Sequence, residues 1–381
     1  MSKEFEINTS DLQENIPSLN TIYFYLTEGC NCKCRHCWIT PKYETGGEGK
    51  WPYVALPAFK KIIKQGLKLG LSSVKLTGGE PLIHPDILDI IKYVESTGLR
   101  LIIETNGLAC TPEIATAIKR CSNPFVSISL DGAKPETHNW VRGVNNAYTG
   151  ALNGVRNLVN VGIHPQLIMS LVKRNKDQIE ELVQLAEKIG AGSVKFNLVA
   201  PVMDRGEQMS EQDELLNITE FIEIGKKIEQ EIQAKSKIKL HYSHPFAFKS
   251  LSTLFEKNDR GRCGIFGIIG VLGSGKYALC GIGESVPEMI FGDVQKDKLA
   301  DIWHNNALLN EIREGLPQKL EGICGDCIMK SMCLGQCIAN NYFVHHNLFG
   351  SYWFCEEAHK MKLFPESRLT PGSKSARELI S

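Results

Sequence analysis

The sequence predicts an α/β fold, a partial (β/α)6 barrel of the TIM type, followed by a smaller cysteine-rich module. From Thr21 to about Leu198, short β-branched or aromatic runs alternate with longer stretches whose apolar residues recur at helical spacing. Beyond about residue 240 this periodicity fades, and glycine and cysteine become frequent. Alternating strands and helices imply a parallel sheet with right-handed crossovers, and six such units suggest an open or partial barrel. Its ligands are expected at the carboxyl ends of the strands.

Six strands are predicted, at residues 21–26, 73–76, 100–104, 125–130, 166–171 and 193–198. Amphipathic stretches predict helices over residues 52–69, 85–97, 112–120, 148–161, 176–189 and 211–235. Several of these stretches begin after proline or end at glycine, where helix starts and stops are expected.

The composition changes after the last long helix. The run GIFGIIGVLGSGKYALCGIG predicts a tight hairpin rather than another strand–helix unit. We therefore expect an N-terminal extension at residues 1–20, the barrel at 21–240, the cysteine-rich module at 241–365 and a polar, loosely held tail at 366–381.

Charge and hydropathy exclude several classes of partner. The chain has 43 basic and 43 acidic residues, so no strong field gathers nucleic acid or an anionic membrane. The first residues are polar and acidic, unlike a signal peptide, and no stretch approaches the ~18 apolar residues of a spanning helix. We expect a cytoplasmic protein with no nucleic-acid or membrane partner, whose substrate is small and neutral or peptidic.

The 13 cysteines are expected to bind metal, because cytosolic thiols are kept reduced and disulfides are rare there. They gather near the two ends of the chain. Cys110 and Cys121 stand apart from both groups and are predicted to be ordinary buried thiols.

Three cysteines of the first group follow the first predicted strand with the spacing C-x3-C-x2-C: Cys30, Cys34 and Cys37. Iron–sulfur clusters are normally held by four thiolates, so three ligands would leave one iron open to a substrate or cofactor. Cys32 offers a fourth thiolate, so the spacing alone also allows a structural zinc site.

The second motif is LTGGEP, at the end of the second predicted strand. Its two glycines let the backbone approach a ligand, and Glu80 offers a carboxylate to an ammonium group. A C-x3-C-x2-C loop after strand one followed by a GGE turn after strand two resembles the radical S-adenosylmethionine (SAM) superfamily.

This resemblance implies a four-iron cluster on Cys30, Cys34 and Cys37, with the amino and carboxylate groups of SAM on its open iron. It assigns the methionine amine to the turn formed by Gly78, Gly79 and Glu80. His36 stands where the family has an aromatic residue, so it is expected to pack near adenine, and Cys32 is expected to be a bystander.

The segment SISLDG at the fourth strand end resembles the family's ribose-contacting segment, with Ser129 as the hydroxyl ligand. Asp131 and Arg142 are expected within reach of the same site, although a surface salt bridge stays an alternative for Arg142. Glu104 and Asn106 face the cavity or form the turn that follows strand three. The fifth strand carries no clear match to the family.

Seven cysteines make up the second group: Cys263 and Cys280, a C-x2-C-x5-C-x3-C run and a final Cys355. A zinc ribbon explains one C-x2-C pair but not the whole set. The spacing resembles the SPASM domain of radical SAM maturases. That resemblance places an outer auxiliary cluster on Cys324, Cys327, Cys333 and Cys355, and an inner one on Cys263, Cys280 and Cys337.

The inner cluster is thus one cysteine short. Either another residue fills the place, for which Asp259 and His244 are candidates, or one iron is open to a substrate donor group.

The resemblance implies three iron–sulfur clusters, reductive cleavage of SAM to a 5′-deoxyadenosyl radical, and abstraction of a hydrogen atom from the substrate. It favours an oxidative maturase that crosslinks a ribosomally made peptide, and the run around YALCGIGESVPE resembles the SynChlorMet-cassette SPASM proteins. Sulfatase-maturing enzymes carry Asp after the G-x4-C cysteine, where this chain has Gly281.

Three other interpretations remain at this point: a haem-modifying tetrapyrrole enzyme, a maturase of a partner protein, and a redox or scaffold protein without SAM chemistry. With 29 residues before Cys30, a fused leader-binding domain is not expected, so a separate leader-binding protein or the barrel itself recognises a leader. The expected electron donor is a ferredoxin or flavodoxin.

Overall fold

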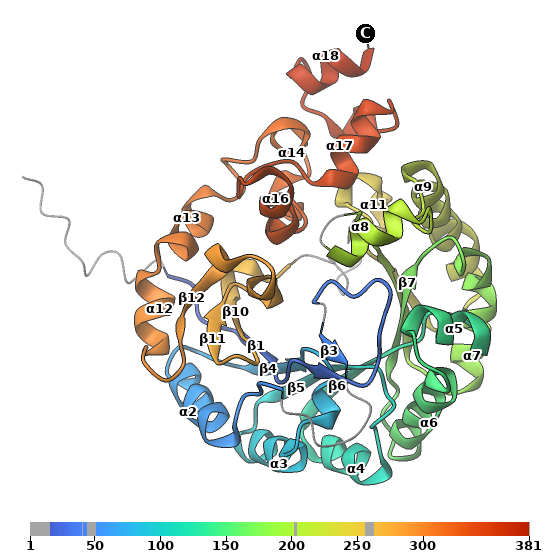
Figure 1. Cartoon of the computed structure of the whole chain (residues 1–381). Helices are drawn as coiled ribbons and strands as arrows, with labels where there is room; N and C mark the ends of the chain where they lie inside the picture. Colours follow the sequence, from blue (N-terminus) through green and yellow to red (C-terminus); the bar gives the residue numbers. More distant parts are fainter. Residues whose placement is uncertain (1–15, 40, 44–50, 202–203, 256–262, 381) are drawn as a thin grey trace, which may run out of the picture.

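A curved sheet of ten strands forms the centre of the molecule, in the order β12-β11-β10-β1-β4-β5-β6-β7-β8-β9 (Figure 1). The structure is a computed structural model that describes residues 16–380 apart from 40, 44–50, 202–203 and 256–262. The ten strands are β1 (Thr21–Tyr25), β4 (Ser73–Thr77), β5 (Arg100–Thr105), β6 (Ser122–Ser129), β7 (Gln166–Leu171), β8 (Ser193–Leu198), β9 (Lys239–Tyr242), β10 (Ile268–Val271), β11 (Lys276–Ala278) and β12 (Ile290–Asp293).

All neighbours from β10 through β1 to β9 are parallel, and β10, β11 and β12 are antiparallel to one another. Within the described residues β12 and β9 are the two edges, so the barrel is open and the predicted fold class is confirmed. A separate short pair, β2 (Gly29–Cys30) and β3 (Lys42–Tyr43), follows β1.

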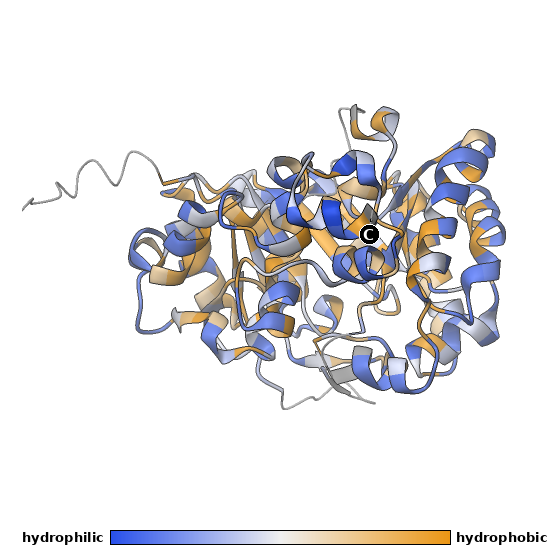
Figure 2. Ribbon diagram, turned by 90° about the horizontal axis from the view of Figure 1, so that it is seen from above, coloured by the Kyte–Doolittle hydropathy of each residue, from blue (hydrophilic) through white to orange (hydrophobic). Residues whose placement is uncertain are grey.

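The helices pack around the outside of the sheet, with apolar faces inward and polar faces outward (Figures 1 and 2). In α4, for example, Ile114 and Ile118 are buried, and the side chain of Thr111 caps the first turn. The barrel helices are α2 (Leu56–Leu67), α3 (Ile87–Thr97), α4 (Pro112–Arg120), α5 (Pro135–Arg142), α6 (Ala147–Asn160), α7 (Ile179–Lys188), α8 (Asp204–Glu211), α9 (Ile218–Lys227) and α10 (Gln233–Lys235).

The C-terminal region is built from short helices: α11 (Leu251–Phe255), α12 (Leu299–Asn305), α13 (Ala307–Gly315), α14 (Gly322–Asp326), α15 (Lys330–Cys333), α16 (Ile338–His345), α17 (Trp353–Lys360) and α18 (Lys374–Ile380). Its apolar residues join the barrel core, as the ring contact between Phe221 of α9 and Phe354 of α17 illustrates. The two regions therefore share one apolar interior.

Three expectations differ from the structure. The predicted hairpin exists, but it extends the barrel sheet because β10 pairs with β1, and β9 adds a further parallel strand. The helix expected over residues 211–235 is divided, because Asn217 forms a capping box that starts α9 at Ile218. The helix α5, over part of HNWVRG, was not predicted.

The C-terminal tail is held, contrary to the expectation of a loose segment. The backbone N–H of Ser375 donates to the Asp326 carboxylate over 2.9 Å, and the Ser375 carbonyl lies 2.9 Å from Nε2 of His359. Leu369 and Ala376 are buried. The tail is therefore held against α14 and α17 by polar contacts and by buried apolar side chains.

Across the described part of the chain, none of the helices combines the length and the apolar character needed to cross a bilayer.

Candidate functional site

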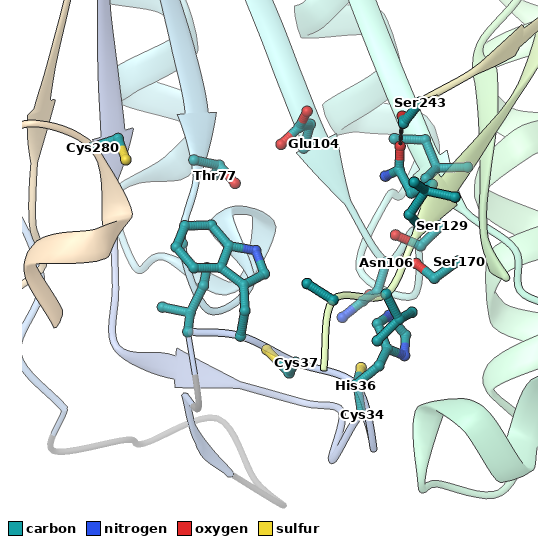
Figure 3. A pocket seen from close by; sticks show the side chains of 18 of the residues that line it. Cys34, His36, Cys37, Thr77, Glu104, Asn106, Ser129, Ser170, Ser243 and Cys280 are labelled. Carbon is teal, nitrogen blue, oxygen red and sulfur yellow. Dashed lines mark hydrogen bonds between the residues drawn. The ribbon is translucent and has the colours of Figure 1, made fainter. Parts of the chain in front are cut away.

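A cavity of about 460 Å³ lies at the carboxyl ends of the parallel strands (Figure 3). Five neighbouring strands each contribute a residue from their last positions: Thr77, Glu104, Ser129, Ser170 and Asn197. The two cysteine groups meet there, because Cys30, Cys34 and Cys37 lie on one wall and Cys280 and Cys337 on another. The fold thus brings together segments that are about 300 residues apart.

The loop after β1 places the first cysteines. Cys30 lies on β2, and a turn in which Cys37 N donates to Cys34 O over 3.4 Å presents the other two. The backbone N–H groups of Lys33 and Arg35 donate to carbonyls at the end of α5, at 2.9 Å each. The unpredicted helix α5 therefore fixes the cysteine loop.

Arg142, the last residue of α5, is aimed at this loop. Its Nη1 donates to Sγ of Cys34 over 3.4 Å, and its Nη2 lies 2.6 Å from the Asp131 carboxylate. Both side chains are buried, and Asp131 also accepts from Ser170 N. Arg142 is therefore not in a surface salt bridge, and Asp131 holds it in place from behind the cavity wall.

The surroundings of Cys34 favour its thiolate form. A hydrogen bond from Cys32 and the charge of Arg142, against the effect of burial, lower the pKa of Cys34 to about 5. The thiolate is the form that binds iron, so both contacts favour the ligand form of Cys34. Cys32 is buried in contact with Cys30 and Cys34, two of the predicted ligands.

The GGE turn packs on the cysteine loop. The backbone N–H groups of Gly79 and Glu80 donate to the carbonyls of Thr27 and Gly29 over 2.9 Å. A Cβ on Gly79 would lie 2.0 Å from the Gly29 carbonyl oxygen, so only glycine permits this approach. The two backbone segments that flank the predicted cluster are thereby held against each other.

The Glu80 carboxylate has hydrogen-bond partners within the protein. It is 1% exposed and accepts hydrogen bonds from the backbone N–H groups of Leu82 and Asn106 and from the hydroxyl of Thr105. It therefore ties the turn after β4 to the end of β5. Gly78, Gly79 and Glu80 all line the cavity.

Two of the predicted inner ligands, Cys280 and Cys337, line the main cavity. Burial, and next the charges of Cys337 and Cys263, raise the pKa of Cys280 to about 12. His244, a candidate fourth ligand, instead lies in an aromatic core beside Tyr242 and Phe354, with Nε2 at the Phe221 carbonyl. The other candidate, Asp259, lies outside the described residues.

The four outer cysteines, Cys324, Cys327, Cys333 and Cys355, line one small enclosed cavity between α14, α15 and α17. The backbone N–H of Tyr352 donates to Sγ of Cys324 over 3.3 Å, and that of Met329 donates to Sγ of Cys327 over 3.4 Å. Such donors stabilise thiolate ligands of a cluster. A four-thiolate donor set of this kind fits an iron–sulfur cluster.

Comparison with known proteins decides the family. The sequence model of the radical SAM superfamily matches residues 24–186, and that of an iron–sulfur cluster-binding domain, SPASM, matches residues 263–328. The AdoMet-dependent heme synthase of Methanosarcina barkeri is 30% identical over 340 residues, 86% of this chain and 93% of that protein. The chain belongs to the radical SAM superfamily.

Two further proteins resemble this radical SAM enzyme. The mycofactocin maturase MftC of Mycobacterium tuberculosis is 25% identical over 357 residues, 91% of this chain and 85% of that protein. The solved structure of Streptococcus suis SuiB bound to the precursor peptide SuiA has a TM-score of 0.70 and 16% identity, over 91% of this chain and 78% of that one. The structural likeness supports the fold alone.

The predicted cofactors follow from the two family matches. This radical SAM/SPASM oxidoreductase uses SAM and iron–sulfur clusters, and three clusters is the number typical of SPASM enzymes. Cys30, Cys34 and Cys37 line the main cavity together with Cys280 and Cys337, and the four outer cysteines line a second, smaller one.

Sequence reasoning missed several residues that line the cavity. Ile168 and Ser170 of β7 do so from alternate positions on one face, although the fifth strand matched no family motif. The alternation itself was the available signal, because residues two apart on a strand share a face. Trp38, Asn340 and Tyr352 come from loops and short helices, where no periodicity marks the inward face.

Gly79→Ala tests the close contact between the GGE turn and the cysteine loop. The new methyl group requires a shift of backbone, so we expect a loss of about 1–3 kcal/mol of folding free energy and at least a tenfold weaker affinity for SAM. Thermal unfolding and equilibrium dialysis of SAM measure the two effects. Gly98→Ala is the control, since its Cβ meets no atom within 4 Å and only its φ of 71° is strained. Equal SAM affinities in the two variants would contradict the assignment.

Proposed function

We propose that this radical SAM/SPASM enzyme oxidatively modifies a ribosomally made peptide, most simply by forming a crosslink. The observation that carries the proposal is the chemistry of the cavity wall beyond the cysteines. Its polar side chains are mainly neutral amides and hydroxyls: Thr77, Asn106, Ser129, Ser170, Asn197, Ser243, Gln336, Asn340 and Tyr352. Such groups both donate and accept hydrogen bonds, which suits the alternating N–H and C=O groups of a peptide backbone.

Relatives support the same substrate class. MftC is named as a maturase, and SuiB has been solved with a precursor peptide. The antilisterial bacteriocin subtilosin biosynthesis protein AlbA of Bacillus subtilis is 29% identical over 177 residues, 46% of this chain and 38% of that protein. A peptide substrate is therefore favoured by relatives as well as by the lining.

A haem-modifying function is the second candidate, because the Methanosarcina barkeri heme synthase is 30% identical. Porphyrins of this class carry propionate carboxylates, which proteins commonly bind with arginine or lysine. Among the described residues that line the cavity, Arg142 has the one guanidinium or ammonium group, and Asp131 already neutralises it. The lining therefore favours a peptide over a multiply anionic tetrapyrrole.

Each proposed ligand set keeps the residues predicted from sequence. Cys30, Cys34 and Cys37 would hold the SAM-binding cluster, whose reduced form supplies the electron that cleaves SAM. His36, Gly78, Gly79, Ser129 and Arg142 line the cavity around these cysteines and are assigned to SAM. Glu80 is assigned to the same site as a residue that positions the turn.

We assign the inner auxiliary cluster to Cys263, Cys280 and Cys337, and the outer one to Cys324, Cys327, Cys333 and Cys355. The proposed domain boundaries are those expected from composition, with the SPASM module beginning near residue 241. A ferredoxin or flavodoxin is the proposed electron donor, and a separate leader-binding protein is one route of substrate recognition.

The test is anaerobic reconstitution followed by reduction with SAM and each short peptide encoded beside the gene. Peptide mass and 5′-deoxyadenosine are read together. A two-hydrogen mass loss with 5′-deoxyadenosine formed is the expected result. Formation of 5′-deoxyadenosine with every peptide unchanged would reject a peptide substrate, and the same assay with an iron porphyrin would then test the second candidate.

A further inference from the structure

A partly buried ion pair inside the barrel joins Lys75 and Glu104. Nζ of Lys75, in the middle of β4, lies 2.7 Å from Oε1 of Glu104, near the end of β5. The Lys75 ammonium also lies 4.7 Å from the centre of the Tyr23 ring. The lysine side chain is 17% exposed and the glutamate side chain 38% exposed, so the carboxylate is the more accessible partner.

The Glu104 carboxylate points into the cavity, between Thr77 and Cys280 on one side and Ser129 on the other (Figure 3). Glu80 and Glu104 are the carboxylates among the described residues of the lining. Glu80 accepts three hydrogen bonds from the protein and is 1% exposed. Glu104 is consequently the carboxylate that a substrate in the cavity can reach.

The place where sulfatase-maturing enzymes carry an acidic residue is closed in this chain. A Cβ on Gly281 would lie 2.3 and 2.5 Å from ring atoms of Tyr25 and 2.8 Å from the ring of Trp38. Two aromatic side chains thus fill the space that an aspartate would need. The accessible carboxylate of the lining, Glu104, comes from β5 instead.

The surroundings keep Glu104 ionised. Burial raises its pKa, but the charge of Lys75, hydrogen bonds from Lys75 and Thr77, and the charge of Lys195 on β8 outweigh burial and leave the pKa below its ordinary value. The phenols of Tyr23 and Tyr25 on β1 also face Glu104, and their pKa values are raised, by burial first, so they stay neutral. Glu104 is therefore in the ionised form, which is the form of a carboxyl group that can accept a proton.

We infer that Glu104 accepts the proton that the peptide substrate loses during its oxidation, and that Lys75 positions Glu104 and keeps it charged. The inference rests on the proposed peptide substrate. Abstraction of one hydrogen atom leaves a carbon-centred radical on the peptide. That radical loses one electron to an oxidant of the iron–sulfur class, and one proton passes from an adjoining N–H, O–H or C–H bond to Glu104. A new bond then forms at the oxidised carbon, and the peptide is two hydrogens lighter.

Glu104→Gln tests the proton acceptor, with the peptide whose mass the wild type lowers as the probe. We expect 5′-deoxyadenosine still to form while crosslinked product per 5′-deoxyadenosine falls at least about 100-fold. Two further measurements do not depend on product formation. The affinity for the same peptide, measured by calorimetry, should be unchanged, and an organic radical should accumulate in electron paramagnetic resonance spectra. A lost affinity would instead make Glu104 a substrate anchor, and an unchanged product yield would overturn the inference.

Lys75→Met tests the positioning role through pH. Without the cation the pKa of Glu104 should rise, so the acidic limb of the product yield should move to higher pH. If the acidic limb of the product yield stays at the same pH, Lys75 does not position Glu104. Because either single change leaves a buried charge unpaired, Lys75→Met/Glu104→Gln is the variant that keeps the charges balanced, and it should show the same loss of product.

The matched control is Glu180→Gln, which breaks a Lys227–Glu180 pair of 2.6 Å on the outer helices. Its product yield should equal that of the wild type. If the wild type changes the mass of no peptide, the proposed function itself fails and the Glu104 role on a peptide fails with it. An active wild type with an equally active Glu104→Gln would reject only the Glu104 role.

Discussion

Replacing Cys34 by alanine should abolish 5′-deoxyadenosine formation. The change removes a predicted ligand whose pKa is lowered to about 5, and it leaves the Arg142 guanidinium without the sulfur to which it donates. A buried cation that loses a partner is costly, so a lower unfolding temperature should accompany the loss of activity. Chromatography of 5′-deoxyadenosine and thermal unfolding measure these two consequences, and the iron content after reconstitution reports the loss of the ligand.

Cys32→Ala is the matched control, since it removes another buried thiol of the same loop and, with it, the hydrogen bond to Cys34, but no predicted ligand. It should keep the iron of the first cluster and cleave SAM. If Cys32→Ala lost iron as completely as Cys34→Ala, a four-thiolate metal site on this loop would replace the three-thiolate assignment.

Cys327→Ala should lose the modified peptide while retaining part of the SAM cleavage. Cys327 lines the small outer cavity with the other three outer cysteines, whereas the SAM-binding cysteines lie on the barrel cavity. Loss of an outer ligand should therefore interrupt oxidation of the substrate more than cleavage of SAM. The ratio of product to 5′-deoxyadenosine measures the difference.

Cys121→Ala controls for the removal of a buried thiol elsewhere, because Cys121 lies at the end of α4 with its sulfur near the Ile91 carbonyl. The ratio of product to 5′-deoxyadenosine in Cys121→Ala should match that of the wild type. If Cys327→Ala lost SAM cleavage and product equally, the outer cysteines would have a structural role rather than one in oxidation.

Local sequence patterns were sufficient to predict the six strands and the two motifs that follow them. The six predicted strands are present because β-branched and aromatic runs between helical stretches are short-range signals. The C-x3-C-x2-C loop and the GGE turn follow the strand ends, so a parallel sheet necessarily brings them to one edge. The radical SAM family could thus be predicted before any tertiary contact was known.

The rest of the fold could not be predicted, because it depends on contacts between residues that are far apart in the sequence or on single local contacts. The β10–β11 hairpin could be predicted from its turn, but its pairing with β1 depends on residues about 250 positions apart. The division of the helix at residues 211–235 follows from one cap, at Asn217, which competes with a continuous amphipathic pattern. The docking of α18 rests on a few contacts to Asp326 and His359 that leave no periodic signal.

The sequence by itself determined the family, the cofactors and which residue types meet at the strand ends. The tertiary structure decided what each carboxylate does: Glu80 is occupied by the end of β5, and Glu104 is held towards the cavity by Lys75. It also decided that Arg142 reaches Cys34, which precedes it by 108 positions, and that Tyr25 and Trp38 close the space beside Gly281. A motif fixes which groups are present, but hydrogen-bond partners and excluded volume depend on packing between segments that are remote in sequence.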